Sequence, residues 1–267
     1  MKKSLNQSLL DEIKNKDYSA ITSTIENFLL DKIKENNLKG LILGLSGGID
    51  SAVVAYLCKG KLKEKTLAII MPDTEITPKT ETEDALKMIA LTGIEYKLID
   101  IRPIVYEYSK YLEPNDWAKG NLRARVRANI LYYYANAKNY LVLGSSDKSE
   151  YLIGYFTKYG DGASDIVPIL SLYKLQVREL AKFLDVPKSI IEKKSSPHLW
   201  KDHIAEDEIG ASYEEIDAIL YCLYEKNLSA SETVNLTNID EKIVEKIQQL
   251  YFKSSHKRDL QTNPLES

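Results

Sequence analysis

The chain has 267 residues, with 36 Lys and Arg against 39 Asp and Glu, and a pI near 5.8. A content of 44% hydrophobic and 28% charged residues excludes a disordered chain, and the slightly negative charge argues against a general nucleic-acid binder. No apolar run approaches the roughly 20 residues of a membrane-spanning helix, and the first residues lack a signal segment. We therefore expect a cytoplasmic protein in which Cys58 and Cys222 stay reduced in the core.

The first half of the chain alternates between two hydrophobic patterns. Apolar residues at helical spacing predict helices, and short continuous apolar runs predict strands that are buried on both faces. In chain order we expect a helix over 18–36, a strand over 41–45, a helix from residue 52, a strand over 67–71, a helix over 79–92, a strand over 96–101, a helix over 120–137 and a strand over 140–144. Strands that alternate with helices indicate a parallel α/β sheet.

The second half is mainly helical. A fifth strand over 165–169 would lie at an edge or near its end, because Pro168 cannot donate to a ladder. Helices are expected over 173–184, 187–194, 212–225 and 240–253; the segment 193–210 has the length of a loop or lid, and the polar tail 254–267 is expected to be irregular. Without repeats or linkers, residues 1–267 are expected to form one domain, a doubly wound parallel five-stranded sheet flanked by helices, with a helical C-terminal part.

The run Leu45-Ser46-Gly47-Gly48-Ile49-Asp50-Ser51 lies between the first strand and its helix. Its glycines allow a tight turn, and the following helix N-terminus offers N–H groups to an oxyanion. The alternative is a plain turn in which Asp50 is an N-terminal helix acid. A carboxylate beside a phosphate repels it unless a divalent cation lies between them, so Asp50 points to magnesium.

This loop resembles the pyrophosphate loop of the ATP-pyrophosphatase superfamily, which includes GMP synthetase, asparagine synthetase, tRNA-modifying enzymes and NAD synthetase. In that superfamily the loop holds the pyrophosphate that leaves when ATP adenylylates a substrate. The loop alone indicates only the superfamily.

A second cluster begins where the fourth strand ends and covers residues 144–165. Ligands bind at the carboxyl ends of strands in open α/β sheets. Four charged residues, Glu150, Lys158, Asp161 and Asp165, occur in this stretch among three glycines. A solvated loop with its charges facing water is the alternative.

The second cluster closely resembles the signature of ammonia-dependent NAD synthetases, in which a strand end of the type G-T-D-N-K-S-E precedes G-Y-F-T-K-Y-G-D-G. The resemblance extends from about residue 20 to 258, through Gly120-Asn121 and the arginines after it, residues 168–181 and His256-Lys257-Arg258. It implies a fold like that of the adenine nucleotide alpha hydrolases. It also implies a homodimer with the deamido-NAD site at the subunit interface.

The resemblance also implies roles for individual residues. The ATP phosphates would be surrounded by Gly44, Leu45, Ser46, Gly47, Gly48, Ile49, Asp50 and Ser51. ATP would further meet Ser145, Ser196, Lys174 and, through its backbone at the adenine, Met71. Magnesium would be bound by Asp50 and Glu150, and the catalytic residues would be Asp50 and Lys174. Deamido-NAD would contact Arg125, Lys158, Asp165, His256 and Lys257.

The implied reaction has two steps. The nicotinate carboxylate of deamido-NAD attacks the α-phosphorus of ATP and releases pyrophosphate, and ammonia then displaces AMP to give NAD. Positioning and electrostatics carry such chemistry, which fits the lack of a nucleophile constellation. Free ammonia is the expected donor, unless a separate protein delivers it, because the chain has no room for a glutaminase domain.

Other basic and aromatic groups have plainer interpretations. Arg123, Arg125 and Arg127 do not all share one helical face, so a solvated helix is expected, with only Arg125 singled out by the resemblance. Tyr132-Tyr133-Tyr134 is interpreted as core plus interface. The histidines at 198, 203 and 256 are expected in surface or capping roles.

One segment departs from the family pattern, because Asp202-His203-Ile204-Ala205 replaces the Gly-Gln-Thr-Asp portion of a family lid. No lid residue is therefore carried over. Two alternatives remain: another pyrophosphate-loop adenylylating enzyme, or an ATP-binding module that has lost catalysis.

Overall fold

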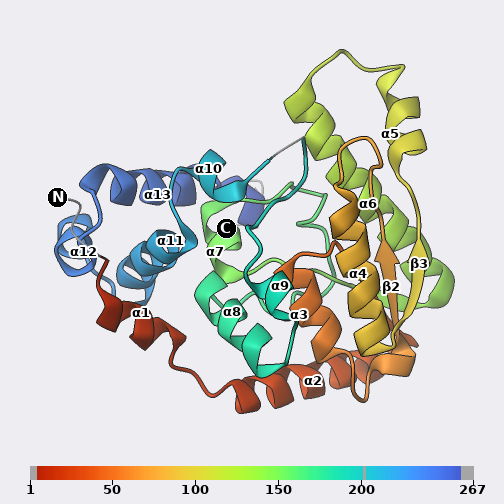
Figure 1. The fold of residues 1–267 in the computed structure, drawn as a ribbon, viewed down its shortest axis with the longest axis horizontal. Coiled ribbons are helices and arrows are strands. Elements are labelled where there is room, and N and C mark those ends of the chain that lie inside the picture. Colours follow the sequence, from red (N-terminus) through yellow and green to blue (C-terminus); the bar gives the residue numbers. More distant parts are fainter. Residues whose placement is uncertain (1–4, 201–202, 260–267) are drawn as a thin grey trace, which may run out of the picture.

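The computed structural model describes residues 5–200 and 203–259 (Figure 1). Its centre is a parallel sheet of four strands, β1 (Gly40–Gly44), β2 (Thr66–Ile70), β3 (Glu95–Leu98) and β4 (Tyr140–Leu143), in the order β3-β2-β1-β4. Leu41 of β1 is paired with Thr66 on one side and with Leu141 on the other. The strand order reverses between β1 and β4, so the carboxyl ends of these two strands form the switch point where ligands bind in such sheets.

The expected fifth strand is not formed, and this part of the fold prediction is corrected from five strands to four. Only Ile166 forms a parallel bridge, to Leu143, and the Gly144 N–H donates to the Ile166 carbonyl at 2.8 Å. Pro168 has no N–H to extend the pairing. The chain therefore leaves the sheet after one residue pair.

Helices cover both faces of the sheet. One face packs on α5 (Arg102–Ser109) and α6 (Asp116–Lys138), where Ile42, Leu67 and Val142 meet Val105 and Val126. The other face packs on α2 (Tyr18–Glu35), α3 (Ile49–Leu57), α4 (Lys79–Thr92), α8 (Lys174–Phe183) and α9 (Lys188–Ile191), with the short 3₁₀ turn η1 (Lys63–Lys65) before β2. Leu41 and Leu43 point to this second face, because side chains alternate along a strand. The sheet is thus buried on both sides, as its continuous apolar strands predict.

A second group of helices builds its own hydrophobic core at the other end of the molecule (Figure 1). It contains α1 (Gln7–Lys14), α7 (Lys148–Ile153), α10 (Ala205–Ile209), α11 (Tyr213–Leu220), the π-helical turn η2 (Tyr221–Glu225), α12 (Ala230–Thr237), α13 (Glu241–Lys253) and the short α14 (Ser255–Arg258). The helix expected over 212–225 therefore changes to π-helical geometry at residue 221. The expected irregular tail begins with α14 instead, and its residues 260–267 lie outside the described residues.

Helix α8 joins the two cores. Its Leu175 belongs to the core of the helical group, whereas Val177, Leu180 and Ala181 belong to the core under the sheet.

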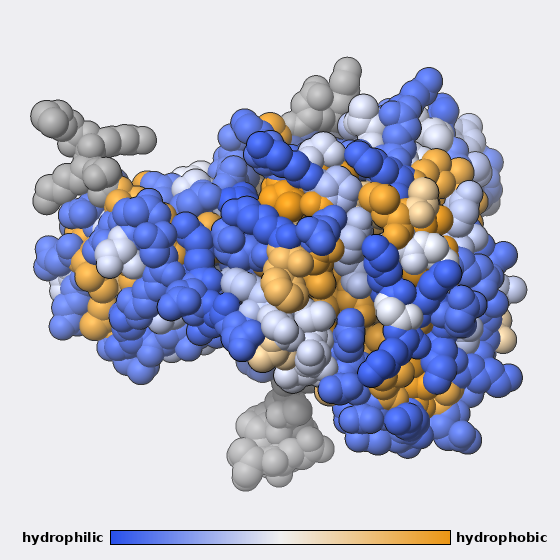
Figure 2. Space-filling view, turned by 60° about the horizontal axis from the view of Figure 1, so that its bottom comes forward, coloured by the Kyte–Doolittle hydropathy of each residue, from blue (hydrophilic) through white to orange (hydrophobic). Residues whose placement is uncertain are grey.

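Cys58 and Cys222 are buried and free, as predicted. Figure 2 shows one face of the molecule, where hydrophilic side chains predominate and hydrophobic ones gather in patches. Within the described residues, no helix is long and apolar enough to span a membrane.

Candidate active site

The loop after β1 folds into a tight turn that opens α3. Gly47 has φ of +88°, and a Cβ on it would lie 2.3 Å from the Glu81 carbonyl oxygen, so only glycine fits. The Gly48 N–H donates to Ser46 Oγ at 3.2 Å, and the Ser51 hydroxyl donates to the Gly48 carbonyl at 3.1 Å. No side chain caps the N-terminus of α3 at Gly48, which leaves first-turn N–H groups for an anion.

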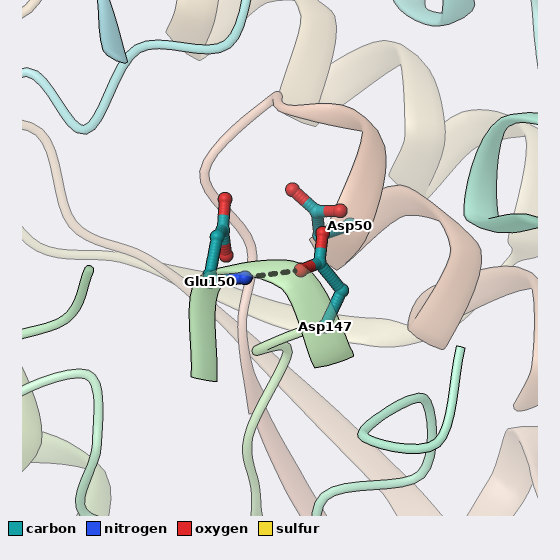
Figure 3. Close-up of side chains that lie close together, drawn as sticks. All are labelled: Asp50, Asp147 and Glu150. Carbon is teal, nitrogen blue, oxygen red and sulfur yellow. Dashed lines mark hydrogen bonds between the residues drawn. The ribbon is translucent and has the colours of Figure 1, made fainter. Parts of the chain in front are cut away.

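Three carboxylates converge beside this loop (Figure 3). Asp50 comes from the first turn of α3, and Asp147 and Glu150 come from the start of α7. Oxygen atoms of the three lie within 4.8 Å of one another. Such a set of oxygen donors fits magnesium, which is bound through carboxylates and substrate phosphates.

Lys174 enters the cluster from the first turn of α8 and is fully buried. Its Nζ lies 2.8 Å from Asp50 Oδ1, 2.7 Å from Asp147 Oδ2 and 2.9 Å from Glu150 Oε1. One ammonium therefore faces three carboxylates. This excess of negative charge favours a divalent cation in the same place.

The electrostatics of the cluster follow from burial and charge. Burial raises the pKa of Glu150 to about 8, with the Asp147 charge adding to the effect. Burial likewise raises the pKa of Asp147 to about 6, against the opposing charge of Lys174. Burial alone would lower the pKa of Lys174, but the three carboxylates outweigh it and raise that pKa well above its ordinary value.

Asp147 is a cluster residue that the sequence reasoning did not single out. Its Oδ1 accepts a hydrogen bond from the Glu150 N–H at 2.8 Å, so it caps the helix that carries Glu150. The signal was present, since an Asp three residues before a Glu at a strand end is a helix-start pattern.

A cavity of about 370 Å³ adjoins the loop and the cluster. Of the expected ATP-site residues, its lining includes Gly44, Leu45, Ser46, Gly48, Ile49, Asp50, Met71, Ser145 and Ser196, and it also includes Glu150, the expected magnesium ligand. Gly47, Ser51 and Lys174 are not in the lining; Gly47 and Ser51 shape the turn, and Lys174 lies behind the carboxylates. The cavity continues past Asn121 of α6 to Lys257 of α14. The structure therefore brings most of the expected ATP residues to the lining of a single cavity.

Four of the expected deamido-NAD residues lie near one another, and Asp165 is held elsewhere. Arg125 Nε donates to the Lys158 carbonyl at 3.3 Å, and Lys158 Nζ donates to the His256 carbonyl at 2.6 Å. Lys257 Nζ donates to the Gly154 carbonyl at 2.6 Å and lines the cavity. Asp165 instead accepts the Val142 N–H at 2.7 Å, which ties it to β4.

The expectation of a solvated arginine helix is wrong for two of the three arginines. Arg123 is buried, and its Nε lies 2.7 Å from Asp73 Oδ2. Arg127 Nε donates to the Met71 carbonyl at 3.0 Å, and burial lowers the pKa of Arg127 to about 10. These two residues are four apart and share the inner face of α6, whereas Arg125 lies on the exposed side.

The segment 193–204 borders the cavity as a long loop, and its residues 201–202, including Asp202, lie outside the described residues. Lys193 Nζ donates to the Gly47 carbonyl and to Glu81 Oε2, each at 3.1 Å. Ser196 Oγ accepts the His198 N–H at 3.2 Å. The start of the loop is thus attached to the phosphate turn and to α4.

In the later part of this loop, His203 does not have the surface role that was expected for it. His203 is buried, stacks on Trp200 with ring centroids 3.6 Å apart, and lies 2.7 Å from Glu208 Oε2. Tyr155 also donates to Glu208 Oε2, at 2.6 Å. His198 lines the cavity, whereas His256 is exposed as expected.

A glycine turn at a sheet switch point, facing a buried carboxylate–lysine cluster, is typical of α/β enzymes that act on nucleotides. The model of the NAD synthase family matches residues 21–261, and the chain belongs to that family.

Several known proteins resemble the chain along nearly its whole length. NH(3)-dependent NAD(+) synthetases of Hyperthermus butylicus and Staphylothermus marinus are 46% and 48% identical, over 96% and 93% of this chain and 94% and 92% of their own. Among solved structures, an NMN synthetase from Francisella tularensis has a TM-score of 0.82 at 36% identity, covering 94% of this chain and 99% of its own. The NH3-dependent NAD synthetase from Campylobacter jejuni has a TM-score of 0.79 at 36% identity, with 93% and 99% covered.

Proposed function

We propose that the protein is an ammonia-dependent NAD synthetase, a ligase that uses ATP to convert the carboxylate of deamido-NAD into an amide. The observation that carries the proposal is the cluster of Asp50, Asp147, Glu150 and Lys174 beside the phosphate turn. A carboxylate oxygen bonds to the α-phosphorus of ATP as the bond to pyrophosphate breaks. Ammonia then bonds to the carbonyl carbon, a proton is lost, and AMP leaves with that oxygen.

Magnesium would be held by Asp50 and Glu150, with Asp147 close enough to join them, and it would neutralise charge on the departing pyrophosphate. Residues of the protein supply the rest of the charge. Lys174, whose Nζ is paired with all three carboxylates, would add its positive charge to the phosphate site. The free N–H groups of α3 hold the leaving group at the turn.

The substrate end of the cavity is assigned to Arg125, Lys158, His256 and Lys257. Lys257 lines the cavity, and Arg125, Lys158 and His256 are linked to one another through backbone carbonyls next to it in the fold. This polar group would suit the second nucleotide of deamido-NAD. Asp165 is not assigned a substrate contact in this group, because its carboxylate accepts the Val142 N–H of β4.

We further propose a homodimer through α5 and α6. Both helices expose large aromatic side chains, among them Tyr106 of α5 at 65%, and Trp117 and Tyr133 of α6 at 66% and 68%. Exposed apolar patches of this kind mark protein interfaces. A cytoplasmic location and a single functional unit over residues 1–267 remain predictions from the sequence.

A second candidate is amidation of the mononucleotide, giving NMN, and the likeness to the Francisella tularensis protein supports it. The first candidate is favoured because the relatives at 46% and 48% identity bear the name NAD synthetase.

One experiment separates these candidates. The protein is incubated with ATP, magnesium and ammonium, and with either deamido-NAD or nicotinate mononucleotide, and the nucleotides are resolved by chromatography. We expect equimolar NAD and AMP from deamido-NAD, with no NAD when ammonium is omitted or replaced by glutamine, and none from Asp50→Asn or Glu150→Gln. NMN as the preferred product would select the second candidate. ATP binding without AMP formation would select a module that has lost catalysis, and AMP formation only with another acceptor would select a different adenylylating enzyme.

A further inference from the structure

Helix α11 directs two polar side chains at the cluster from the helical core. Tyr213 and Asp217 are four residues apart and share one face of the helix. Both are fully buried. Apolar side chains of the helical core pack around α11, so the polar atoms of these two residues have protein groups rather than water as partners.

Tyr213 contacts two members of the cluster. Its hydroxyl donates to Glu150 Oε1 at 2.9 Å. Its ring lies under Lys174, with Nζ 4.8 Å from the ring centroid. Tyr213 therefore restrains the Glu150 carboxylate by a hydrogen bond and the Lys174 ammonium by a cation–π contact.

Asp217 reaches the same two helices one layer deeper. One carboxylate oxygen accepts the Ser149 hydroxyl of α7, and the other accepts the Leu175 N–H of α8 at 2.7 Å. Ser149 Oγ in turn accepts the Lys174 N–H at 2.9 Å. Ser149 precedes Glu150, and Leu175 follows Lys174, so one carboxylate fixes the backbone on which both cluster residues stand.

Burying a carboxylate among apolar side chains is costly unless each oxygen is hydrogen-bonded. If α11 served only to pack against its neighbours, an apolar residue could fill the position of Asp217. Instead, both oxygens of Asp217 bind donors that adjoin the cluster. This arrangement is what a support for reactive groups requires.

We propose that Tyr213 and Asp217 are positioning residues that hold Glu150 and Lys174 in the geometry that binds metal and nucleotide phosphates. The inference rests on the proposed function only in taking the cluster to be the metal–nucleotide site.

A matched pair of variants tests Tyr213. Tyr213→Phe removes the hydroxyl that donates to Glu150 Oε1 at 2.9 Å, and Tyr221→Phe removes one that donates to Glu12 Oε1 at the same distance, eight residues further along the same helical run. Binding of Mn²⁺ and of Mn²⁺·ATP is measured by electron paramagnetic resonance without deamido-NAD or ammonium, and folding is checked by thermal unfolding.

We expect Tyr213→Phe to weaken Mn²⁺·ATP binding on the order of tenfold, as loss of a hydrogen bond to a metal ligand does, with Tyr221→Phe unchanged. Equal binding by the two variants would overturn the role of Tyr213. Because this readout needs no turnover, it decides the inference even if the protein makes no NAD.

A double-mutant cycle tests Asp217 with Ser149. Asp217→Asn and Ser149→Ala should each weaken Mn²⁺·ATP binding, and the double variant should lose little more than the worse single one, because both changes break one connection. Additive losses would overturn the connection through Ser149. If Asp217→Asn does not fold, Ser149→Ala alone is compared with Thr237→Val, a buried hydroxyl in α12 remote from the cluster. Equal Mn²⁺·ATP binding by Ser149→Ala and Thr237→Val would also overturn the connection through Ser149.

Discussion

The sheet half and the helical half of the molecule contribute to the same cluster in different ways. The sheet half supplies Asp50 through a short local motif, a tight turn that joins a strand to a helix. The helical half supplies Tyr213 and Asp217 through contacts that span 63 and 68 residues of sequence. Asp147 and Glu150 come from the start of α7 in the helical half, and Lys174 comes from α8, which joins the two cores.

A local motif can therefore indicate where a site lies without indicating which side chains support it. A phosphate turn needs particular residues in sequence, because its backbone must approach a ligand. A supporting side chain needs only the right place on a packed helix, and many sequences provide that. The two halves therefore make separable predictions about catalysis and stability.

The largest effect is expected where the halves meet. Lys174→Met leaves three carboxylates without their buried cation, so turnover should fall by about 10²–10³-fold, the loss typical of removing a group that stabilises transition-state charge. The measurement is single-turnover release of pyrophosphate. Lys182→Met, on the exposed end of the same helix and paired only with Glu179, is the control. Near-normal turnover in Lys174→Met would show that Lys174, where the two halves meet, takes no part in the reaction.

The next largest effect concerns the stability of the sheet half. Arg123→Met leaves Asp73 buried without its cation, which should lower the free energy of unfolding by about 3–5 kcal/mol. Lys110→Met breaks an exposed pair with Glu107 and should change it by less than about 1 kcal/mol. Urea unfolding of both variants checks this, and equal midpoints would show that the Arg123–Asp73 pair contributes nothing to stability.

A smaller effect isolates the phosphate turn. Gly47→Ala forces a side chain into a left-handed conformation and against the Glu81 carbonyl, at a cost of about 1–3 kcal/mol. ATP affinity should fall about tenfold to hundredfold if the turn bears that strain. Gly60→Ala meets no atom within 4 Å and should bind ATP normally. Calorimetric titration with ATP compares the two variants. Unchanged ATP affinity in Gly47→Ala would show that the turn is not part of the ATP site.

The last effect is gradual and is the smallest for a change of one pH unit; it concerns Asp217. Burial raises the pKa of Asp217 to about 7. When folding raises the pKa of a carboxyl group, the free energy of unfolding falls as pH rises from the pKa of the unfolded state to that of the folded state. Between about pH 4 and 7 this group should therefore cost up to about 1.4 kcal/mol of unfolding free energy per pH unit. Asp217→Asn should lack this slope, and parallel stability curves for the two proteins would contradict the assignment.

Much of the fold was predictable because it depends on local patterns. The helix expected over 79–92 matches α4, and each of the four strands lies within a few residues of its expected place. The strand expected to reach residue 101 ends at Leu98, although Ile99 and Ile101 still donate to the Ile70 and Pro72 carbonyls. The fifth strand failed at Pro168, where the ladder has no donor.

The site was predictable in part for the same reason. Its phosphate turn and the ends of its strands follow from sequence spacing and from the family resemblance. The burial of Arg123 depends on Asp73, fifty residues away, and that of His203 depends on Trp200 and Glu208 across a loop without periodicity. Such pairings appear only once the chain is folded, because no local pattern specifies a distant partner.

We propose that the substrate carboxylate is adenylylated where the two halves of the molecule meet. Deamido-NAD labelled with ¹⁸O in its nicotinate carboxylate tests it directly, with mass spectrometry of the products. We expect one ¹⁸O atom in AMP for each NAD formed, because the carboxylate oxygen that attacks the α-phosphorus leaves with the phosphate. AMP free of label, formed together with NAD, would contradict it.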